Sequence, residues 1–156
     1  MSEALAKGYQ FGFESSSDHR STHISYANVC VTDTTRQGIL EGLSKRRVYA
    51  SNDLILADVR IGEHFMGEAF TMTGAPVVSV NLQGTGAFAE VVIVKDGKIV
   101  YCPVSGPKSF CFTWRDNNAQ AGQQSYYYVR GVQEKTPGQS ATGAVVWTGP
   151  TWVTLQ

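Results

Sequence analysis

Residues 88–102 read Phe-Ala-Glu-Val-Val-Ile-Val-Lys-Asp-Gly-Lys-Ile-Val-Tyr-Cys and place two β-rich runs on either side of a two-residue linker. The linker, Asp96-Gly97, suits a type I′ turn, because both central positions of that turn need a positive φ angle. We therefore predict a β-hairpin with strands at residues 88–95 and 98–102.

The two-residue period of this hairpin extends over the rest of the chain from about residue 52. Apolar or aromatic residues alternate in several further runs: Ile55, Ala57, Val59 and Ile61; Val78, Val80 and Leu82; Phe110, Phe112 and Trp114; Tyr126, Tyr128 and Val132, with Tyr127 and Val129 opposite. Such alternation is typical of strands that bury one face. About eight short strands separated by turn signals predict an antiparallel β-sandwich over residues 52–156.

Residues 1–51 follow a different pattern, which predicts one strand and one helix. The β-branched run at residues 24–31 suits a strand. A helix follows at about residues 34–47, with Thr34 as its cap and Gln37 three residues later. Ile39, Leu40 and Leu43 fall on one face of that helix. One strand and one helix cannot bury their own apolar faces, so we expect this region to pack against something else.

Composition narrows the classes of function. The formal net charge is zero, whereas nucleic-acid binders carry a positive excess that neutralises phosphates. No apolar stretch approaches the roughly 20 residues that span a bilayer, and the first residues lack the apolar core of a signal peptide. We expect no nucleic-acid partner, no membrane span and a cytoplasmic chain, while a parent protein could be exported.

The densest group of chemically active side chains lies at residues 15–23, which read Ser-Ser-Ser-Asp-His-Arg-Ser-Thr-His. Asp18, His19 and His23 combine a carboxylate with two imidazoles, which are common metal ligands. The alternative interpretation is a polar turn whose serines and aspartate bond to nearby backbone. His64, in Gly62-Glu63-His64-Phe65, is expected to be an exposed residue of a hairpin turn. Glu68 is expected on an edge strand or as an ordinary surface charge.

Several segments resemble one known family in the same order along the chain. They are Ser16-Ser17-Asp18-His19-Arg20-Ser21-Thr22-His23, Thr35-Arg36-Gln37-Gly38-Ile39-Leu40, Asp58-Val59-Arg60-Ile61-Gly62, Tyr127-Tyr128-Val129-Arg130-Gly131 and Pro150-Thr151-Trp152-Val153. Together they resemble the C-terminal part of PHP-type metallohydrolases of the CehA/McbA-like branch. The resemblance implies an immunoglobulin-like sandwich at residues 52–156, preceded at residues 1–51 by a strand-helix remnant of a PHP β/α barrel.

The family's barrel holds two or three divalent metals that activate water for ester, carbamate, amide or phosphoester cleavage. By resemblance, Asp18 and His19 would be late ligands of zinc or manganese, and His23 a neighbouring ligand or substrate contact. The family has an early His-x-His motif and one residue between its aspartate and histidine. This chain has no His-x-His motif, and Asp18 and His19 are adjacent.

These departures predict a non-catalytic structural or binding module derived from the family. We expect it to self-associate or to dock on a missing N-terminal catalytic half, with catalytic and substrate-binding residues unassigned. The alternative is a metal-dependent hydrolase completed by oligomerisation or by that missing part. A third hypothesis is a carbohydrate-binding sandwich that uses exposed tryptophans, although aromatic residues at period two are more often sandwich core.

Overall fold

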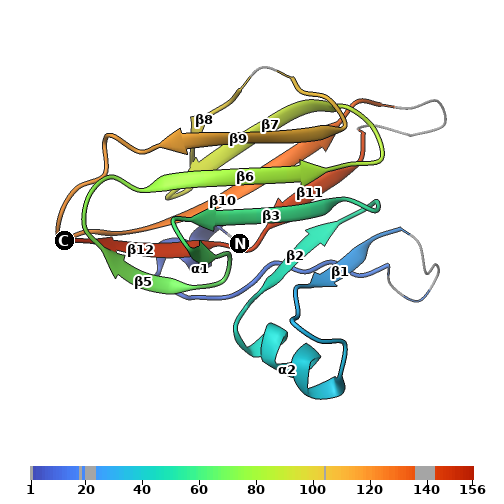
Figure 1. Ribbon diagram of the computed structural model, residues 1–156, viewed down its shortest axis with the longest axis horizontal. Helices are drawn as coiled ribbons and strands as arrows, with labels where there is room; N and C mark the ends of the chain where they lie inside the picture. The colour runs from blue at the N-terminus through green and yellow to red at the C-terminus, as the bar shows by residue number, and fades with distance from the viewer. Residues whose placement is uncertain (1, 18, 20–23, 104, 136–142) are drawn as a thin grey trace.

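Strands dominate the computed structural model, which describes residues 2–17, 19, 24–103, 105–135 and 143–156. Two sheets pack face to face as a β-sandwich, and a smaller strand-helix-strand unit extends from one side (Figure 1). The elements are α1 Ser2–Ala6, β1 Tyr26–Val29, α2 Arg36–Ser44, β2 Val48–Ser51, β3 Leu56–Ile61, β4 His64–Phe65, β5 Ala69–Met72, β6 Val77–Gln83, β7 Phe88–Lys95, β8 Lys98–Tyr101, β9 Ser109–Arg115, β10 Gln124–Gln133, β11 Val145–Thr148 and β12 Thr151–Leu155. The predicted mainly β sandwich is confirmed at this level.

The larger sheet is built around β10, the longest strand. One edge of β10 pairs with β7, which carries β8, and the other edge pairs with β12 and then β11 along its length. The sheet continues from β11 through β2 to β1, so it crosses the predicted domain boundary at residue 51. The pair of β12 and β5 is parallel, which departs from a purely antiparallel sandwich. The second sheet has the order β4-β3-β6-β9.

The Asp96-Gly97 hairpin forms as predicted. β7 and β8 pair antiparallel, and the φ angles of Asp96 and Gly97 are 48° and 78°, both positive as a type I′ turn requires. The Asp96 carboxylate also accepts a hydrogen bond from the Tyr126 amide at 2.9 Å. The turn is therefore tied to the central strand of the same sheet.

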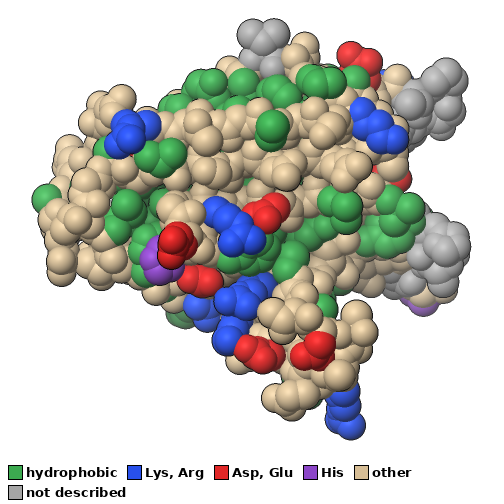
Figure 2. All heavy atoms as spheres, in the orientation of Figure 1, with side chains coloured by type: hydrophobic (Ala, Val, Ile, Leu, Met, Phe, Trp, Pro, Cys, Tyr) green, Lys and Arg blue, Asp and Glu red, His purple; other side chains and the backbone are tan. Residues whose placement is uncertain are grey.

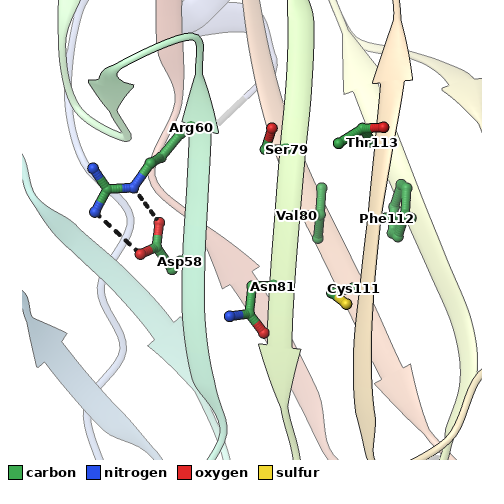
Figure 3. Close-up of a pocket in the computed structure, with 8 residues that line it drawn as sticks. All are labelled: Asp58, Arg60, Ser79, Val80, Asn81, Cys111, Phe112 and Thr113. Carbon is green, nitrogen blue, oxygen red and sulfur yellow. Dashed lines mark hydrogen bonds and ion pairs between the residues drawn. The ribbon is translucent and has the colours of Figure 1, made fainter.

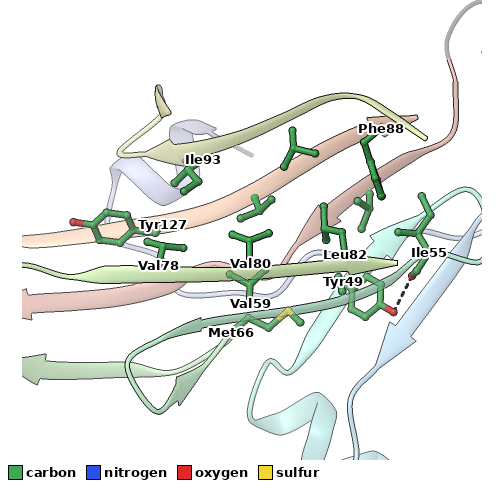
Figure 4. Close-up of a cluster of buried hydrophobic side chains, with 14 of the residues drawn as sticks. Tyr49, Ile55, Val59, Met66, Val78, Val80, Leu82, Phe88, Ile93 and Tyr127 are labelled. Atoms are coloured by element: carbon green, nitrogen blue, oxygen red, sulfur yellow. Dashed lines mark hydrogen bonds between the residues drawn. The ribbon is translucent and has the colours of Figure 1, made fainter. Parts of the chain in front are cut away.

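Alternating side chains of both sheets form the main core (Figure 4). On β6, Val78, Val80 and Leu82 are each at most 2% exposed, as the sequence predicted. Opposite them on β3 lie Ile61, Val59 and Ala57 in register. On β10, Tyr127 and Val129 point into this core.

The opposite face of β10 is covered by the N-terminal arm, residues 2–17. Leu5 and Phe13 of the arm are 4% and 3% exposed and pack with Tyr126 and Trp152. The Phe13 ring meets that of Tyr128 edge to face, 5.3 Å between centroids. This packing lets the central strand bury both faces. This covering role is not predicted by any periodic pattern, because the arm is irregular apart from the five-residue helix α1.

Helix α2 is shorter than predicted. Its cap is Thr35 rather than Thr34, since the Thr35 hydroxyl accepts the Gly38 amide hydrogen bond at 3.1 Å. The helix ends at Ser44 rather than near residue 47, because Arg46 has a left-handed φ of 56°. The region also has a second strand, β2, in addition to the predicted one.

A buried carboxylate lies where the two sheets meet at one end of the sandwich. Asp116 is 2% exposed and accepts from Lys95 Nζ at 2.5 Å, from the Tyr127 hydroxyl at 2.8 Å and from the Asn118 amide at 3.0 Å. Burial alone would raise the pKa of Asp116, but these hydrogen bonds and the Lys95 charge hold it below its usual value. The carboxylate is therefore stabilised in its ionised form.

Replacing Asp116 with asparagine should lower the free energy of unfolding at pH 7 by about 3–5 kcal/mol, because Lys95 loses its partner in a nearly closed site. The stabilisation from the lowered pKa is complete above the unfolded value of about 3.9 and disappears as the pH falls through the folded value. Urea unfolding between pH 7 and pH 3 measures both effects. In the exposed pair of Asp58 and Arg60, Asp58→Asn should cost at most about 1 kcal/mol. Equal losses in the two variants would contradict the prediction.

Candidate functional site

Serine side chains hold the two ends of the predicted metal segment together. The Ser17 hydroxyl accepts from the amides of Ile24 and Ser25 at 3.0 and 2.9 Å, and it donates to the Ser25 carbonyl at 2.8 Å. One donor and two acceptor positions are all that a hydroxyl has. Residues 17 and 25 are thus neighbours, on either side of the segment that carries the predicted ligands.

Of the three predicted ligands, only His19 lies within the described residues, where it is exposed in a turn. Asp18 and His23 lie outside them. Across the part of the chain that the structure describes, no group of three or more His, Cys, Asp or Glu side chains could hold a metal ion. Metal ligation by Asp18, His19 and His23 therefore stays a prediction.

The backbone of Arg46 is the point where the strand-helix-strand unit meets the sandwich. A Cβ atom added at Gly67, Gly149 or Gly12 would lie 2.4, 3.3 or 3.4 Å from the Arg46 carbonyl oxygen. These glycines belong to the turn before β5, the corner between β11 and β12, and the N-terminal arm. The Arg46 oxygen is the nearest atom only at Gly67, whereas at Gly149 and Gly12 the nearest atoms are the Val48 carbonyl oxygen at 2.6 Å and the Val48 side chain at 2.2 Å. Three segments therefore pack closely on residues 46–48, and side chains at these glycines would hold them apart.

The Arg46 side chain reinforces the same junction. Its Nε donates to the Gly67 carbonyl at 3.0 Å, and its guanidinium lies over the Trp152 ring, 5.5 Å from the ring centroid. The Gly67 amide in turn donates to the Pro150 carbonyl at 2.9 Å. Both ends of the arginine, backbone and guanidinium, are therefore fixed against the sandwich.

A polar pocket of about 440 Å³ opens beside this junction, between the end of α2 and strands β4 and β5. Glu68 accepts from His64 Nδ1 at 3.0 Å and from Arg47 at 3.2 Å. Burial would raise the pKa of Glu68, but the hydrogen bonds from His64 and Arg47 hold it below its usual value. The His64 ring also stacks on Phe70 at 3.6 Å.

The expected hairpin around His64 forms, with Gly62 and Glu63 as its turn, and the His64 side chain is 43% exposed. His64 begins strand β4, and its ring is fixed by a carboxylate on one nitrogen and by an aromatic ring on one face. Glu68 links β4 to the residues after α2 rather than standing alone on the surface. The closeness of His64 and Glu68 in the sequence was the only signal that could have indicated this cluster. Its third member, Arg47, lies 21 residues before Glu68 in the chain.

Figure 2 shows Lys and Arg side chains gathered below this pocket, close to a histidine and acidic side chains. The figure also shows the outer face of the smaller sheet, where a second hollow of about 480 Å³ lies. Its charged residues, Asp58 and Arg60, are paired with each other through two hydrogen bonds of 2.8 and 3.1 Å (Figure 3). The other lining residues are uncharged, so this hollow has no charged group left free for a ligand, unlike the pocket at α2.

Helix α2 itself exposes the apolar face that the sequence predicted. Ile39, Leu40 and Leu43 are 42%, 50% and 41% exposed. The side of the helix that packs against β1 carries glycine, and a Cβ added at Gly42 would lie 2.8 Å from the Val29 side chain. The large apolar residues therefore point away from the chain's own strands.

The tryptophans are less accessible than a carbohydrate platform requires. Trp152 is 2% exposed, and Trp147 is half-buried beneath the arm, 6.4 Å from the Phe13 ring. Trp114 is half-buried and stacks on Tyr101, 6.1 Å between centroids. The arm covers the aromatic face of the larger sheet, so the carbohydrate hypothesis gains no surface from this arrangement.

No known protein family, curated protein or solved structure matches this chain. None of the helices in the described ranges has both the length and the apolar character needed to cross a membrane. The kinship with PHP-type metallohydrolases thus has no support besides the motifs quoted above. The functional argument depends on the geometry of α2, its junction and the pocket.

Substituting alanine at Gly67 should cost about 3 kcal/mol or more in the free energy of unfolding. The methyl group would collide with the Arg46 carbonyl, and the φ of +95° disfavours any side chain. Gly74 is the matched control, because its φ is +79° and nothing lies within 4 Å of an added Cβ. Gly74→Ala should cost only about 1–2 kcal/mol. Chemical denaturation measures both, and equal costs would refute a steric crossing at Arg46.

Zinc or manganese binding at the predicted segment is tested by calorimetry. In the double variant His19→Ala/His23→Ala, we expect the affinity for zinc to fall at least about tenfold. This fall corresponds to a loss of about 1.4 kcal/mol in binding free energy. His64→Ala, which removes the remaining histidine, should leave the affinity unchanged. Absence of metal-dependent heat in the wild type would contradict ligation by Asp18, His19 and His23.

Proposed function

We propose that this protein is a non-catalytic binding module that associates with a second copy of itself through α2 and β1. The observation that carries the proposal is the exposed apolar face of α2, formed by Ile39, Leu40 and Leu43. Full burial of one such side chain contributes about 1.5–3 kcal/mol of stabilising free energy. Because these three side chains are half exposed, the folded chain alone gains only part of that free energy. A partner surface would recover it.

The helix needs such support. With nine residues, α2 is shorter than the roughly 12–15 residues that an isolated helix needs for marginal stability in water. Its packing against β1 uses glycine, which buries little apolar area. A partner that covers Ile39, Leu40 and Leu43 would stabilise the helix as well as the complex.

The apolar face of α2 is too small to form a stable dimer interface alone, so a neighbouring element must contribute. A stable interface buries about 800 Å² on each partner, more than three half-exposed side chains supply. The neighbouring strand β1 pairs with β2 along one edge, and its other edge has no strand partner among the described residues. Antiparallel pairing of β1 with β1 of a second copy satisfies this edge, extends the interface and closes with two-fold symmetry.

We further propose that the module descends from the C-terminal part of a PHP-type metallohydrolase, with an immunoglobulin-like sandwich. The support is the order of the sequence motifs, together with a strand-helix-strand unit followed by a sandwich. The alternative, a metal-dependent hydrolase completed by oligomerisation or by a missing N-terminal part, depends on Asp18, His19 and His23. Hydrogen bonds between Ser17 and Ser25 hold the residues on either side of that segment together.

Light scattering of the purified chain tests self-association. We expect a dimer at about 100 μM, and a monomer for Leu40→Glu, because a carboxylate would have to be buried without a partner. Leu54→Glu is the matched control, since Leu54 is 69% exposed but lies outside this surface. That control should remain dimeric. A monomeric wild type at this concentration, or equal effects of both substitutions, would sink the proposal.

A further inference from the structure

We propose that the pocket between the end of α2 and strands β4 and β5 binds a small organic monocarboxylate, with the Arg46 guanidinium as its anchor. This site uses other residues than the self-association surface, which it adjoins along α2, and it lies apart from the predicted metal segment. Its volume of about 440 Å³ lies within the range of about 300–1,000 Å³ typical of small-molecule pockets.

Arg46 is set apart from the neighbouring cations by its lack of an acidic partner. Lys45 pairs with Glu41, and Arg47 pairs with Glu68. Arg46 forms no ion pair with any carboxylate among the described residues, although it lines the same pocket. The pocket therefore contains one uncompensated positive charge.

The Arg46 guanidinium is also held in place before any ligand arrives. Its Nε is committed to the Gly67 carbonyl, and its plane is supported by the Trp152 ring. The two terminal nitrogens remain for a ligand, and together they match the two oxygens of a carboxylate. Because the side chain is already ordered, binding loses less rotamer entropy than at a mobile arginine.

The charges around Arg46 favour a singly charged ligand over a dianion. Glu68 lies in the pocket wall, and the C-terminal end of α2 adds a partial negative charge of its own. A phosphate dianion would meet both repulsions, whereas a carboxylate balances the single free charge of Arg46. The pocket thus favours ligands with a single negative charge, in addition to any selection by shape.

The opposite wall suits an apolar or aromatic body. Phe70 and the His64 ring form a parallel stack, and Glu68 orients the imidazole through Nδ1. This arrangement leaves Nε2 of His64 as the second polar group for the ligand. A ligand with a flat apolar body and one carboxylate therefore matches the wall and the anchor together.

Benzoate and its uncharged analogue benzamide are the probes. In an NMR titration of the full chain, we expect saturable shifts of the Arg46 Nε–Hε resonance with benzoate, at a dissociation constant of about 1 mM. Benzamide should cause none, and inorganic phosphate should bind at least several-fold more weakly. Benzamide shifts equal to those of benzoate, or shifts that never saturate, would overturn the proposal.

Two variants separate the anchor from general effects on the fold. Arg46→Lys keeps the charge but loses the fork of donors, and it should weaken benzoate at least about fivefold. Arg60→Lys is the matched control, because Arg60 also lies over an aromatic ring but is occupied by Asp58. That control should bind benzoate as the wild type does.

Phe70→Leu provides a second readout in case Arg46→Lys unfolds the chain. It should weaken benzoate while leaving the weaker binding of acetate unchanged, because acetate has no aromatic body. The proposed site would be contradicted if Arg46→Lys and Arg60→Lys lost equal benzoate affinity, or if Phe70→Leu left the benzoate affinity unchanged.

Discussion

Three glycines, Gly12, Gly67 and Gly149, let distant parts of the chain pass close to the segment from Arg46 to Val48. At Gly67, an added Cβ would lie 2.4 Å from the Arg46 carbonyl oxygen. Arg46 itself takes a left-handed backbone conformation, which ends α2 and turns the chain into β2. The crossing therefore sets where the helix stops, where β2 joins the larger sheet and how the turn before β5 approaches the sandwich.

Both proposed surfaces depend on this junction. It holds α2 with its glycine side toward β1, so that Ile39, Leu40 and Leu43 stay exposed. It also places the Arg46 guanidinium over Trp152 at the margin of the pocket. Ser44, which lines that pocket, lies one helical turn after Leu40, so the apolar face and the pocket adjoin along the helix. A small acid bound beside Arg46 would thus lie near the proposed protein interface.

The sequence predicts the local parts of this fold well. Asp96-Gly97 specifies its hairpin because the turn needs positive φ at two adjacent positions, and the alternation along β3 and β6 identifies the buried residues because the strand period is two. The exposed apolar face of α2 follows from helical spacing in the same way. These features depend on neighbours within a few residues.

The remaining features depend on contacts between residues far apart in the chain. The parallel pairing of β5 with β12 joins segments about 80 residues apart, and the arm covers β10 without any regular pattern of its own. The glycine crossing could not be predicted, since a glycine in a sequence does not show which backbone it approaches. His64 and Glu68 became a candidate site only when Arg47 was brought to them.

Native-state hydrogen exchange tests most directly whether the crossing at Arg46 joins the strand-helix-strand unit and the sandwich into one cooperative structure. Amides of β2, next to the crossing, should exchange with the same opening free energy as those of β10 in the centre of the larger sheet. If β2 opens at a markedly lower free energy while β10 remains protected, the two parts unfold separately and the junction does not have the role assigned to it.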